Sequence, residues 1–246
     1  RLAWVIGTTT RSIGVPADIR KLTISFPYNN ITEFKALISE YRDDIAAVIM
    51  EPIGVEEPGP GYLEQIRKIT STENIVLVFD ECWSGFRVDL KGAAGKYGVF
   101  PDLGCYGKAL GNGVPIAAIL GQTDLMRCFD DVFFSFTFGG DLLGISAALS
   151  VLTTLSDNPV LESISTTGTQ LLEGMEQLIR KHQLERVVSL KGYPARHFIE
   201  FTKDGSPDLI TKTLFQQEAI KGGVLATAWH APSYAHTSKE VETTLN

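Results

Sequence analysis

Two short apolar runs, each followed by a charged residue, constrain the fold of this chain more than any other feature. The run 75–79 (Ile-Val-Leu-Val-Phe) ends at Asp80, and a shorter run over 103–106 precedes Lys108. Runs of this length are typical of strands buried in a sheet. An earlier apolar run, 45–50, is separated from the run at 75–79 by a Pro/Gly-rich loop and an amphipathic helix. We expect this earlier run to be a strand buried on both faces. This strand–helix–strand order predicts an α/β fold with a mostly parallel sheet and right-handed crossovers.

The rest of the chain predicts a glycine-rich loop after Asp80, then longer helices and shorter strands. Helical periodicity covers 142–155 and 159–181, and a last helix is expected from Ser238. The remaining expected elements are an aromatic strand, two short strands, a helix and a further strand, over 133–138, 187–190, 196–201, 207–221 and 224–227. We place a domain boundary within 155–185: a major domain spans 1–155, and a connecting helix with a smaller α+β domain spans 156–246.

Composition narrows the classes of function. The 246 residues are 44% apolar and 21% charged, values typical of a globular protein. The net charge of −7 and the lack of any Lys/Arg run argue against a nucleic-acid partner, and the apolar stretches are too short to cross a membrane. Three cysteines without metal-ligand spacing predict a reduced, cytoplasmic setting and no metal site. The chain starts without a methionine and ends within a predicted helix, so we interpret both ends as cut.

Asp80 and Lys108 each admit a plain structural interpretation. Asp often caps a turn after a strand, although ligands of open α/β sheets also collect at the carboxyl ends of strands. A lysine is ordinarily a solvated surface charge, but Lys108 lies between two predicted strands and beside a glycine that lets backbone approach a ligand. A phosphate-binding Walker loop is excluded, because Ala109 stands where that motif needs Ser or Thr, and Leu103 stands where it needs glycine.

A carboxylate and a lysine in these positions suit pyridoxal 5′-phosphate (PLP). The carboxylate keeps the pyridine nitrogen of the cofactor protonated, and the lysine holds the cofactor as a Schiff base. Thr137, beside Gly139-Gly140, is a candidate donor to a phosphate, with an ordinary helix N-cap as the alternative. Trp83, Trp229 and His230 are either core residues or the lining of a substrate cavity. The histidines form no ligand pair at helical spacing, and no Gly-x-Ser-x-Gly elbow indicates a serine hydrolase.

Several segments resemble the class III aminotransferases of the PLP-dependent fold type I enzymes, and together they cover nearly the whole chain. They are Met50-Glu51-Pro52, Pro60-Gly61-Tyr62-Leu63, Asp80-Glu81 with Gly85-Phe86-Arg87, Tyr97-Gly98-Val99 with Pro101-Asp102-Leu103, and Gly107-Lys108-Ala109-Leu110-Gly111. Within the class, the nearest pattern is that of the glutamate-1-semialdehyde aminomutase branch, through Ile6-Gly7-Thr8-Thr9 and Ala235-His236-Thr237. The resemblance implies a three-layer αβα major domain, incomplete in this chain, followed by a smaller α+β domain.

The resemblance also implies roles for four residues. Asp80 would pair with the pyridinium nitrogen, and Lys108 would form the internal aldimine and move a proton during the reaction. Cys82 would pack against the cofactor ring. Thr137 matches a threonine that reaches the cofactor phosphate, in the family usually that of the neighbouring subunit, so a homodimer with shared sites is expected. The implied reaction transfers an amino group from a small-molecule donor to a small carbonyl acceptor.

Three interpretations of the function remain open. The first is a PLP-dependent aminotransferase, which we favour because Cys82-Trp83 and Asp141-Leu142 depart from the usual pattern, and because 228–234 lacks an acidic residue that aminomutases carry there. The second is glutamate-1-semialdehyde 2,1-aminomutase, an isomerase. The third is a catalytically incompetent fragment, because the family's phosphate-binding Ser/Gly loop and ring-stacking aromatic residue lie upstream of Arg1.

Overall fold

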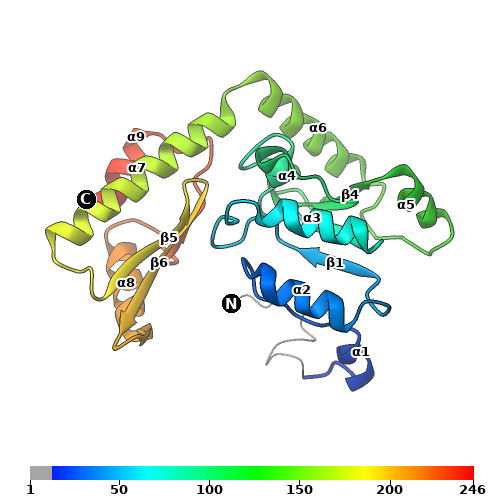
Figure 1. Ribbon diagram of the computed structural model, residues 1–246. Coiled ribbons are helices and arrows are strands. Elements are labelled where there is room, and N and C mark those ends of the chain that lie inside the picture. Colours follow the sequence, from blue (N-terminus) through cyan, green and yellow to red (C-terminus); the bar gives the residue numbers. More distant parts are fainter. Residues whose placement is uncertain (1–12) are drawn as a thin grey trace.

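The computed structural model describes residues 13–246, and its first part is built on a four-stranded sheet (Figure 1). The strands lie in the order β1-β2-β3-β4. β1, β2 and β3 run parallel, whereas β4 is antiparallel to β3. Their bounds are Ala47–Met50, Val76–Asp80, Leu103–Tyr106 and Ala118–Gly121. The predicted α/β class with a mostly parallel sheet is therefore confirmed, while the motif at 6–9 lies outside the described residues.

Two amphipathic helices, α2 (Ile31–Glu40) and α3 (Tyr62–Thr72), pack against this sheet. The Asn30 side chain starts α2 by accepting the backbone N–H of Glu33. The two helices share a core with alternate residues of β1 and β2 and with the short helix α4 (Gly92–Tyr97). The most deeply buried members of this core are Phe34, Leu63, Ile66, Leu77 and Phe79. Burial of this apolar surface is the main force that holds the first part together.

The expectation that 45–50 forms a strand buried on both faces is wrong. Exposed and buried residues alternate along β1: Val48 and Met50 lie in the core, whereas Ile49 is 40% exposed. This alternation is that of a strand with one covered face. The apolar run has the composition of a doubly covered strand, but among the described residues only the face with Val48 and Met50 enters the core.

The glycine-rich segment after Asp80, which the sequence predicts as a loop, contains helix α4. The buried carboxylate of Glu81 accepts the backbone N–H groups of Ala93 at 2.9 Å and Ala94 at 2.8 Å, and the hydroxyl of Ser84 donates to the same carboxylate. A carboxylate in this position satisfies N–H groups that a helix start leaves unpaired. Gly92 has a φ of +70°, and a Cβ there would lie 2.7 Å from the Glu81 carboxylate. Glycine is therefore required at this entry to α4.

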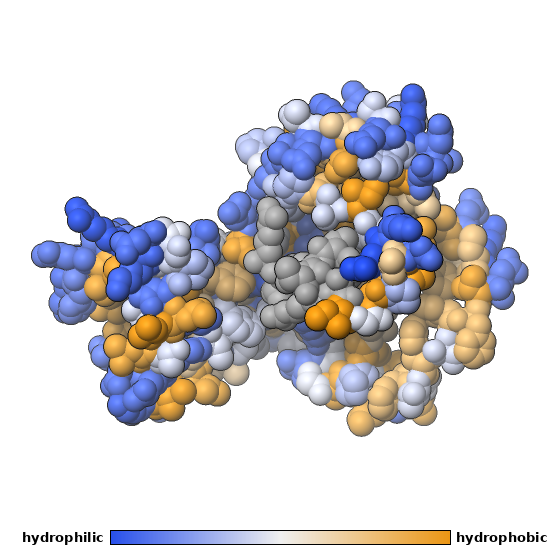
Figure 2. All heavy atoms as spheres, turned by 90° about the horizontal axis from the view of Figure 1, so that it is seen from below, coloured by the Kyte–Doolittle hydropathy of each residue, from blue (hydrophilic) through white to orange (hydrophobic). Residues whose placement is uncertain are grey.

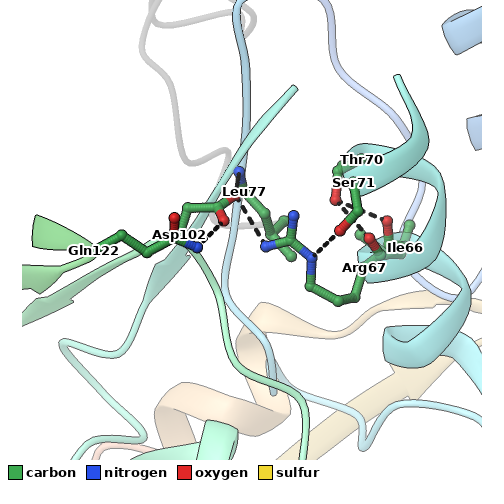
Figure 3. A network of polar contacts seen from close by, with 7 residues as sticks. All are labelled: Ile66, Arg67, Thr70, Ser71, Leu77, Asp102 and Gln122. Carbon is green, nitrogen blue, oxygen red and sulfur yellow. Dashed lines mark hydrogen bonds and ion pairs between the residues drawn. The ribbon is translucent and has the colours of Figure 1, made fainter. Parts of the chain in front are cut away.

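A second carboxylate network lies at the amino-terminal ends of β2 and β3 (Figure 3). Asp102 Oδ2 accepts the backbone N–H of Leu77 at 2.7 Å and lies 2.9 Å from Arg67 Nη1. Its Oδ1 accepts a hydrogen bond of 2.7 Å from Gln122. Arg67 Nε also donates to the Ser71 hydroxyl at 2.9 Å. The network joins α3 to β2, to the start of β3 and to the residue that follows β4.

Helices α6 and α7 connect the first part to a second, smaller part, which is built on antiparallel strands (Figure 1). β5, β6 and β7 are neighbours in that order, and β8 also pairs with β6. α7 and α9 pack on this sheet through a core that includes Leu171, Ile199, Phe201 and Val241. The bounds are α6 Leu142–Asp157, α7 Val160–Lys181, β5 Val188–Tyr193, β6 Arg196–Lys203, β7 Ser206–Pro207, α8 Leu209–Lys221, β8 Trp229–His230 and α9 Ser238–Leu245. The short elements of the first part are α1 Ala17–Lys21, η2 Lys108–Leu110, α5 Thr123–Arg127 and η3 Cys128–Asp130.

Two of the predicted strands are wrong. The segment 224–227 is not a strand; pairing with β6 begins later, at β8, because Ala228 adopts a φ of +63° and its carbonyl accepts the N–H of Ile199. The aromatic segment 133–138 is a loop with turns that pairs with no strand among the described residues. Its phenylalanine side chains lie exposed, with Phe133 99% exposed, so its β-like composition has no sheet edge to join in this structure.

Candidate active site

Asp80 closes β2 at the carboxyl end of the parallel strands, and its Cα partner on β3 is Cys105. The Asp80 Oδ1 atom accepts the backbone N–H of Cys82 at 2.9 Å, so the residue does cap a turn, as the plain interpretation predicts. The Cys82 thiol is its other hydrogen-bond partner, and its side chain makes no ion pair with residues 13–246. No cation of the described residues pairs with this half-buried carboxylate, so its negative charge is available to a ligand.

Lys108 begins the short helix η2, two residues after the end of β3. Its φ is +45°, which is unusual for a residue with a side chain. The preceding residue, Gly107, is buried against Cys82, and a Cβ at Gly107 would lie 3.6 Å from the Cys82 sulfur. Lys108 Nζ lies 5.2 Å from the centroid of the Trp83 ring, and it has no ion-pair or hydrogen-bond partner in the described part of the chain. The amine is thus held beside an aromatic ring and left without a carboxylate of its own.

Cys82 lies between these two charged groups. Burial, followed by the hydrogen bond and negative charge of Asp80, raises the pKa of its thiol to about 12, while the positive charge of Lys108 opposes the shift. A thiol with this pKa stays protonated at neutral pH and acts as a small apolar surface. Because the charges of Asp80 and Lys108 both act on the pKa of this thiol, the two side chains lie near the same residue, Cys82.

Glu51 and Arg196 add a second pair of charges to this edge of the sheet. Glu51 directly follows β1, and its Oε2 lies 3.4 Å from Nη1 of Arg196, the first residue of β6. Burial raises the pKa of Glu51, and the charge of Arg196 opposes that rise; Asp80 and Lys108 also act on it, in opposite directions. The site therefore contains two carboxylates and two cations. Sequence patterns point to Glu51 only as part of a motif, and they give no signal for Arg196.

Aromatic side chains surround these charges. The guanidinium carbon of Arg196 lies 4.2 Å from the centroid of the Trp83 ring, and the ring of Trp229 meets Trp83 edge-on at 5.2 Å. Trp83 thus contacts both cations of the site and Trp229 packs behind it. His230 points elsewhere: its Nδ1 lies 3.2 Å from Nε2 of the buried His197. Of the three candidate cavity residues, the structure brings the two tryptophans to the site.

Thr137 lies on the exposed turn before α6, and no hydrogen bond or ring contact joins it to Asp80, Cys82 or Lys108 among the described residues. The alternative that Thr137 caps α6 is wrong, because the Asp141 side chain accepts the N–H of Gly144 and occupies the N-cap position. A residue with a free hydroxyl on an exposed turn is available to a partner outside the chain.

Within residues 13–246, no three His, Cys, Asp or Glu side chains are grouped so that they could hold a metal ion. None of the helices described there is both long and apolar enough to span a bilayer.

Comparison with known proteins agrees with this geometry. The profile of the family "Aminotransferase class-III" matches residues 12–238. The 3-aminobutyryl-CoA aminotransferase of Cloacimonas acidaminovorans is 32% identical over 94% of this chain and 58% of its own length. The glutamate-1-semialdehyde 2,1-aminomutase of Natranaerobius thermophilus is 31% identical over 97% of this chain and 60% of its own.

A solved structure gives the same picture. The FumI protein of Sphingopyxis sp. MTA144, in its PLP internal aldimine form, superposes with a TM-score of 0.87 and 28% identity, over 94% of this chain and 57% of FumI. The chain thus spans somewhat more than half the length of the relatives it matches. The α/β part and the smaller antiparallel part described above correspond to a portion of a PLP-dependent fold type I architecture.

Proposed function

Because the chain belongs to the class III aminotransferase family, we propose that it carries the reactive lysine and the acid partner of a PLP-dependent aminotransferase. One observation supports this most strongly. Asp80 and Lys108 follow neighbouring parallel strands, border one neutral thiol, and have no ion-pair partner among residues 13–246. A carboxylate and an amine that lie near one thiol and have no ion-pair partner are suited to a ligand that interacts with both.

The residues present fit two ends of the cofactor. The carboxylate of Asp80, which no cation pairs with among the described residues, suits the protonated nitrogen of the pyridine ring, and the Lys108 amine suits the aldehyde. Cys82 offers a neutral surface for the ring, since its pKa of about 12 keeps the thiol uncharged. The phosphate end would be held by residues beyond these, and we propose Thr137 of the neighbouring subunit as one of them. The chain therefore offers one suitable residue for the ring nitrogen and one for the aldehyde.

When bound, PLP supplies an aldehyde that captures the substrate amine and a ring that withdraws electrons from the substrate α-carbon. The role of Asp80 is to hold the proton on the ring nitrogen. Once its amine is free, Lys108 accepts a proton from the substrate α-carbon and returns it at the cofactor C4′. Trp83 limits where that amine can lie, because its ring is 5.2 Å from Nζ. The substrates are a small amino donor and a small carbonyl acceptor.

The first test is the visible absorption band of PLP bound to the purified protein that contains this chain. Lys108→Ala should abolish the band, because the amine that holds the cofactor is gone. Lys68→Ala, on the exposed side of α3, serves as the matched control and should leave the band unchanged. A band that survives Lys108→Ala would show that another amine holds the cofactor. The incompetent-fragment alternative predicts that residues 1–246 alone show no band while a longer protein does.

The homodimer is part of the proposal. Apolar side chains lie exposed along α6 and the loop before it; they include Phe133, Leu142, Leu143 and Leu149, at 99, 77, 68 and 65%. Figure 2 shows that apolar residues also form a visible share of the surface when the molecule is seen from below. An exposed apolar area of this kind is typical of an interface between subunits. Leu143→Asp should convert a dimer into a monomer in light scattering and weaken PLP binding.

We also propose a division into two domains and a cytoplasmic location. A division at 1–155 and 156–246 is supported by the two separate sheets, which α6 and α7 connect. A cytoplasmic location is supported by Cys82, Cys105 and Cys128, which are all unpaired thiols. Limited proteolysis with cleavage near 155–160, and localisation of a tagged full-length protein, test these two statements.

Glutamate-1-semialdehyde 2,1-aminomutase is the second candidate, favoured by relatives of that name at 29–35% identity. The aminomutase moves an amino group within one substrate and needs no separate acceptor. Product formed from the semialdehyde without added oxo acid would favour it. Strict dependence on an added oxo acid or aldehyde would leave the aminotransferase.

A further inference from the structure

Arg87 links the first part of the molecule to the second. Its Nη2 donates to the backbone carbonyl of Ala195 at 2.9 Å and to that of Pro232 at 2.7 Å. Arg87 follows β2, whereas its two acceptors lie in the turn between β5 and β6 and in the loop between β8 and α9. One side chain therefore holds two separate loops of the second part against the first part.

Stability alone is a weak reason for an arginine at this position. Burial lowers the pKa of the Arg87 guanidinium, and its Nε atom is buried without a hydrogen-bond partner among the described residues. Within residues 13–246, no carboxylate forms an ion pair with it. Taking an unpaired charge out of water costs free energy, and two neutral carbonyls offset that cost only in part. The contact is thus better explained by where it places the two loops.

The segment between Asp80 and Arg87 is tightly folded. The backbone N–H of Gly85 donates to the carbonyl of Glu81 at 2.7 Å, which closes a turn directly after β2. Phe86 has a φ of +62°, a conformation that is costly for a residue with a bulky side chain and that persists only where the surroundings enforce it. A short segment held in this way fixes the position of Arg87 relative to the candidate site.

The residues beside the two acceptor carbonyls contact Trp83. Arg196, next to the first carbonyl, has its guanidinium carbon 4.2 Å from the centroid of the Trp83 ring. Trp229, shortly before the second carbonyl, meets the same ring edge-on at 5.2 Å. That ring in turn lies 5.2 Å from Lys108 Nζ. The two loops that Arg87 holds are therefore the ones that pack against the ring beside the amine.

We propose that Arg87 is a positioning residue: by holding both loops, it keeps the Trp83–Trp229 ring pair beside Lys108 and so orients the reactive amine. No contact joins Arg87 to Lys108 among the described residues, so its effect passes through the rings. The cation–π contact with Trp83 restricts the amine only while the ring itself is fixed. This inference rests on the proposed function, because the orientation of the amine matters only if Lys108 reacts.

The test uses the protein that contains this chain, freed of PLP, and follows two signals. The first is the exciton couplet of the Trp83–Trp229 pair in far-ultraviolet circular dichroism, identified as the signal that Trp229→Phe removes. The second is the rate at which the visible band forms when PLP is added back. Glutamine at position 87 is too short to bridge both carbonyls, so Arg87→Gln should lose the couplet. It should also slow band formation about 10- to 100-fold, as expected for a misplaced reacting group, and keep the final band height at saturating PLP.

Two further variants separate positioning from a purely structural role. Arg180→Gln, at an exposed site on α7, is the matched control and should follow the parent in both signals. Arg87→Lys keeps the charge but reaches one carbonyl, so both signals should lie between those of the parent and Arg87→Gln; this variant decides the matter if Arg87→Gln does not fold.

A structural role alone would lower the melting temperature and leave both signals of the folded molecules unchanged. Folded Arg87→Gln or Arg87→Lys protein with the couplet and the rate of the parent would therefore overturn the inference and leave the proposed function intact. A parent protein that forms no PLP band would overturn the proposed function and, with it, the role of Arg87 in orienting the amine.

Discussion

At the amino-terminal ends of β2 and β3, the carboxylate of Asp102 has a partner for each oxygen: the N–H of Leu77 and the guanidinium of Arg67 for one, and the amide of Gln122 for the other. At the carboxyl-terminal ends of the same strands, the carboxylate of Asp80 has one backbone partner. Both groups are acids at the edge of one sheet. They differ in how much of their hydrogen-bonding capacity the chain itself uses.

The difference separates a structural acid from a ligand-binding one. A buried polar group without partners costs stability, so folded chains satisfy such groups unless something else does. On the side of Asp80, Nε of the buried Arg196 has no hydrogen-bond partner among the described residues, and the exposed amine of Lys108 has no ion-pair partner there, whereas Arg67 is engaged by both Asp102 and Ser71. The carboxyl-terminal end of the sheet thus has unused capacity for both signs of charge, as a site for an ionised ligand requires.

The largest expected effect is that of Asp80→Asn. An amide oxygen can still accept the N–H of Cys82, so the fold should persist with a melting temperature close to that of the parent. Without the negative charge, the ring nitrogen of PLP loses its proton and the rate should fall about 10²- to 10³-fold, as for loss of one electrostatic contact to a reacting system. Single-turnover measurement of the amine half-reaction, beside thermal melting, checks both parts.

The opposite pattern is expected for Asp102→Ala. This change leaves the N–H of Leu77 and the guanidinium of Arg67 without their acceptor, at a cost of about 3 kcal/mol in the free energy of unfolding. Activity per folded molecule should stay within a factor of about two, because the network lies at the far end of the strands. Urea denaturation measures the loss. If Asp102→Ala instead lowers turnover as much as Asp80→Asn, the two ends of the sheet are not functionally distinct.

Sequence patterns could predict the strands and helices on which this comparison depends. Apolar runs that end in charge placed Asp80 at a strand end and Lys108 just after one, because strand burial depends on local composition. They also predicted helices near 142–155 and 159–181, observed as α6 and α7. Register was less accessible: the strand expected at 224–227 lies at 229–230, since the pairing with β6 fixes the register and not β-propensity.

The sequence could not predict which charges would meet across the two parts. Arg196 stands in the short sequence Ala-Arg-His-Phe, which contains no motif, and it contacts Glu51 across a sequence separation of 145. Helix α4 was equally hidden, because Glu81, rather than a residue just before the helix, supplies its N-terminal acceptors. Long-range contacts of this kind depend on the packing of the whole chain. Arg87, which donates to the carbonyls of Ala195 and Pro232, is a further example.

The histidine pair His197 and His230 tests whether an unpaired polar group always marks a ligand site in this chain. Nε2 of His230 has no partner among the described residues, yet the pair lies within the paired strands β6 and β8, where the two rings face each other. Incomplete satisfaction here would mark no ligand site. The pair should instead affect the pH dependence of stability, because the buried His197 and the half-buried His230 both favour the neutral form.

Burial, together with the charge of the neighbouring His230, lowers the pKa of His197 to about 4; burial also lowers the pKa of His230. The unfolded chain therefore binds these protons more readily, so the stabilisation is complete above about pH 6.5 and is lost as the pH falls toward 4. For His197 alone the free energy of unfolding should drop by about 2 kcal/mol between pH 7 and pH 5. Urea denaturation at both pH values measures it, with His182→Gln, an exposed histidine, as the control that should follow the parent. In His197→Gln the drop should be smaller by that amount. An unchanged drop in His197→Gln would mean that His197 is protonated as easily in the folded chain as in the unfolded one. If His197→Gln also lost PLP binding, the histidine pair would count as a ligand-binding group. The contrast between the two ends of the sheet would then no longer hold.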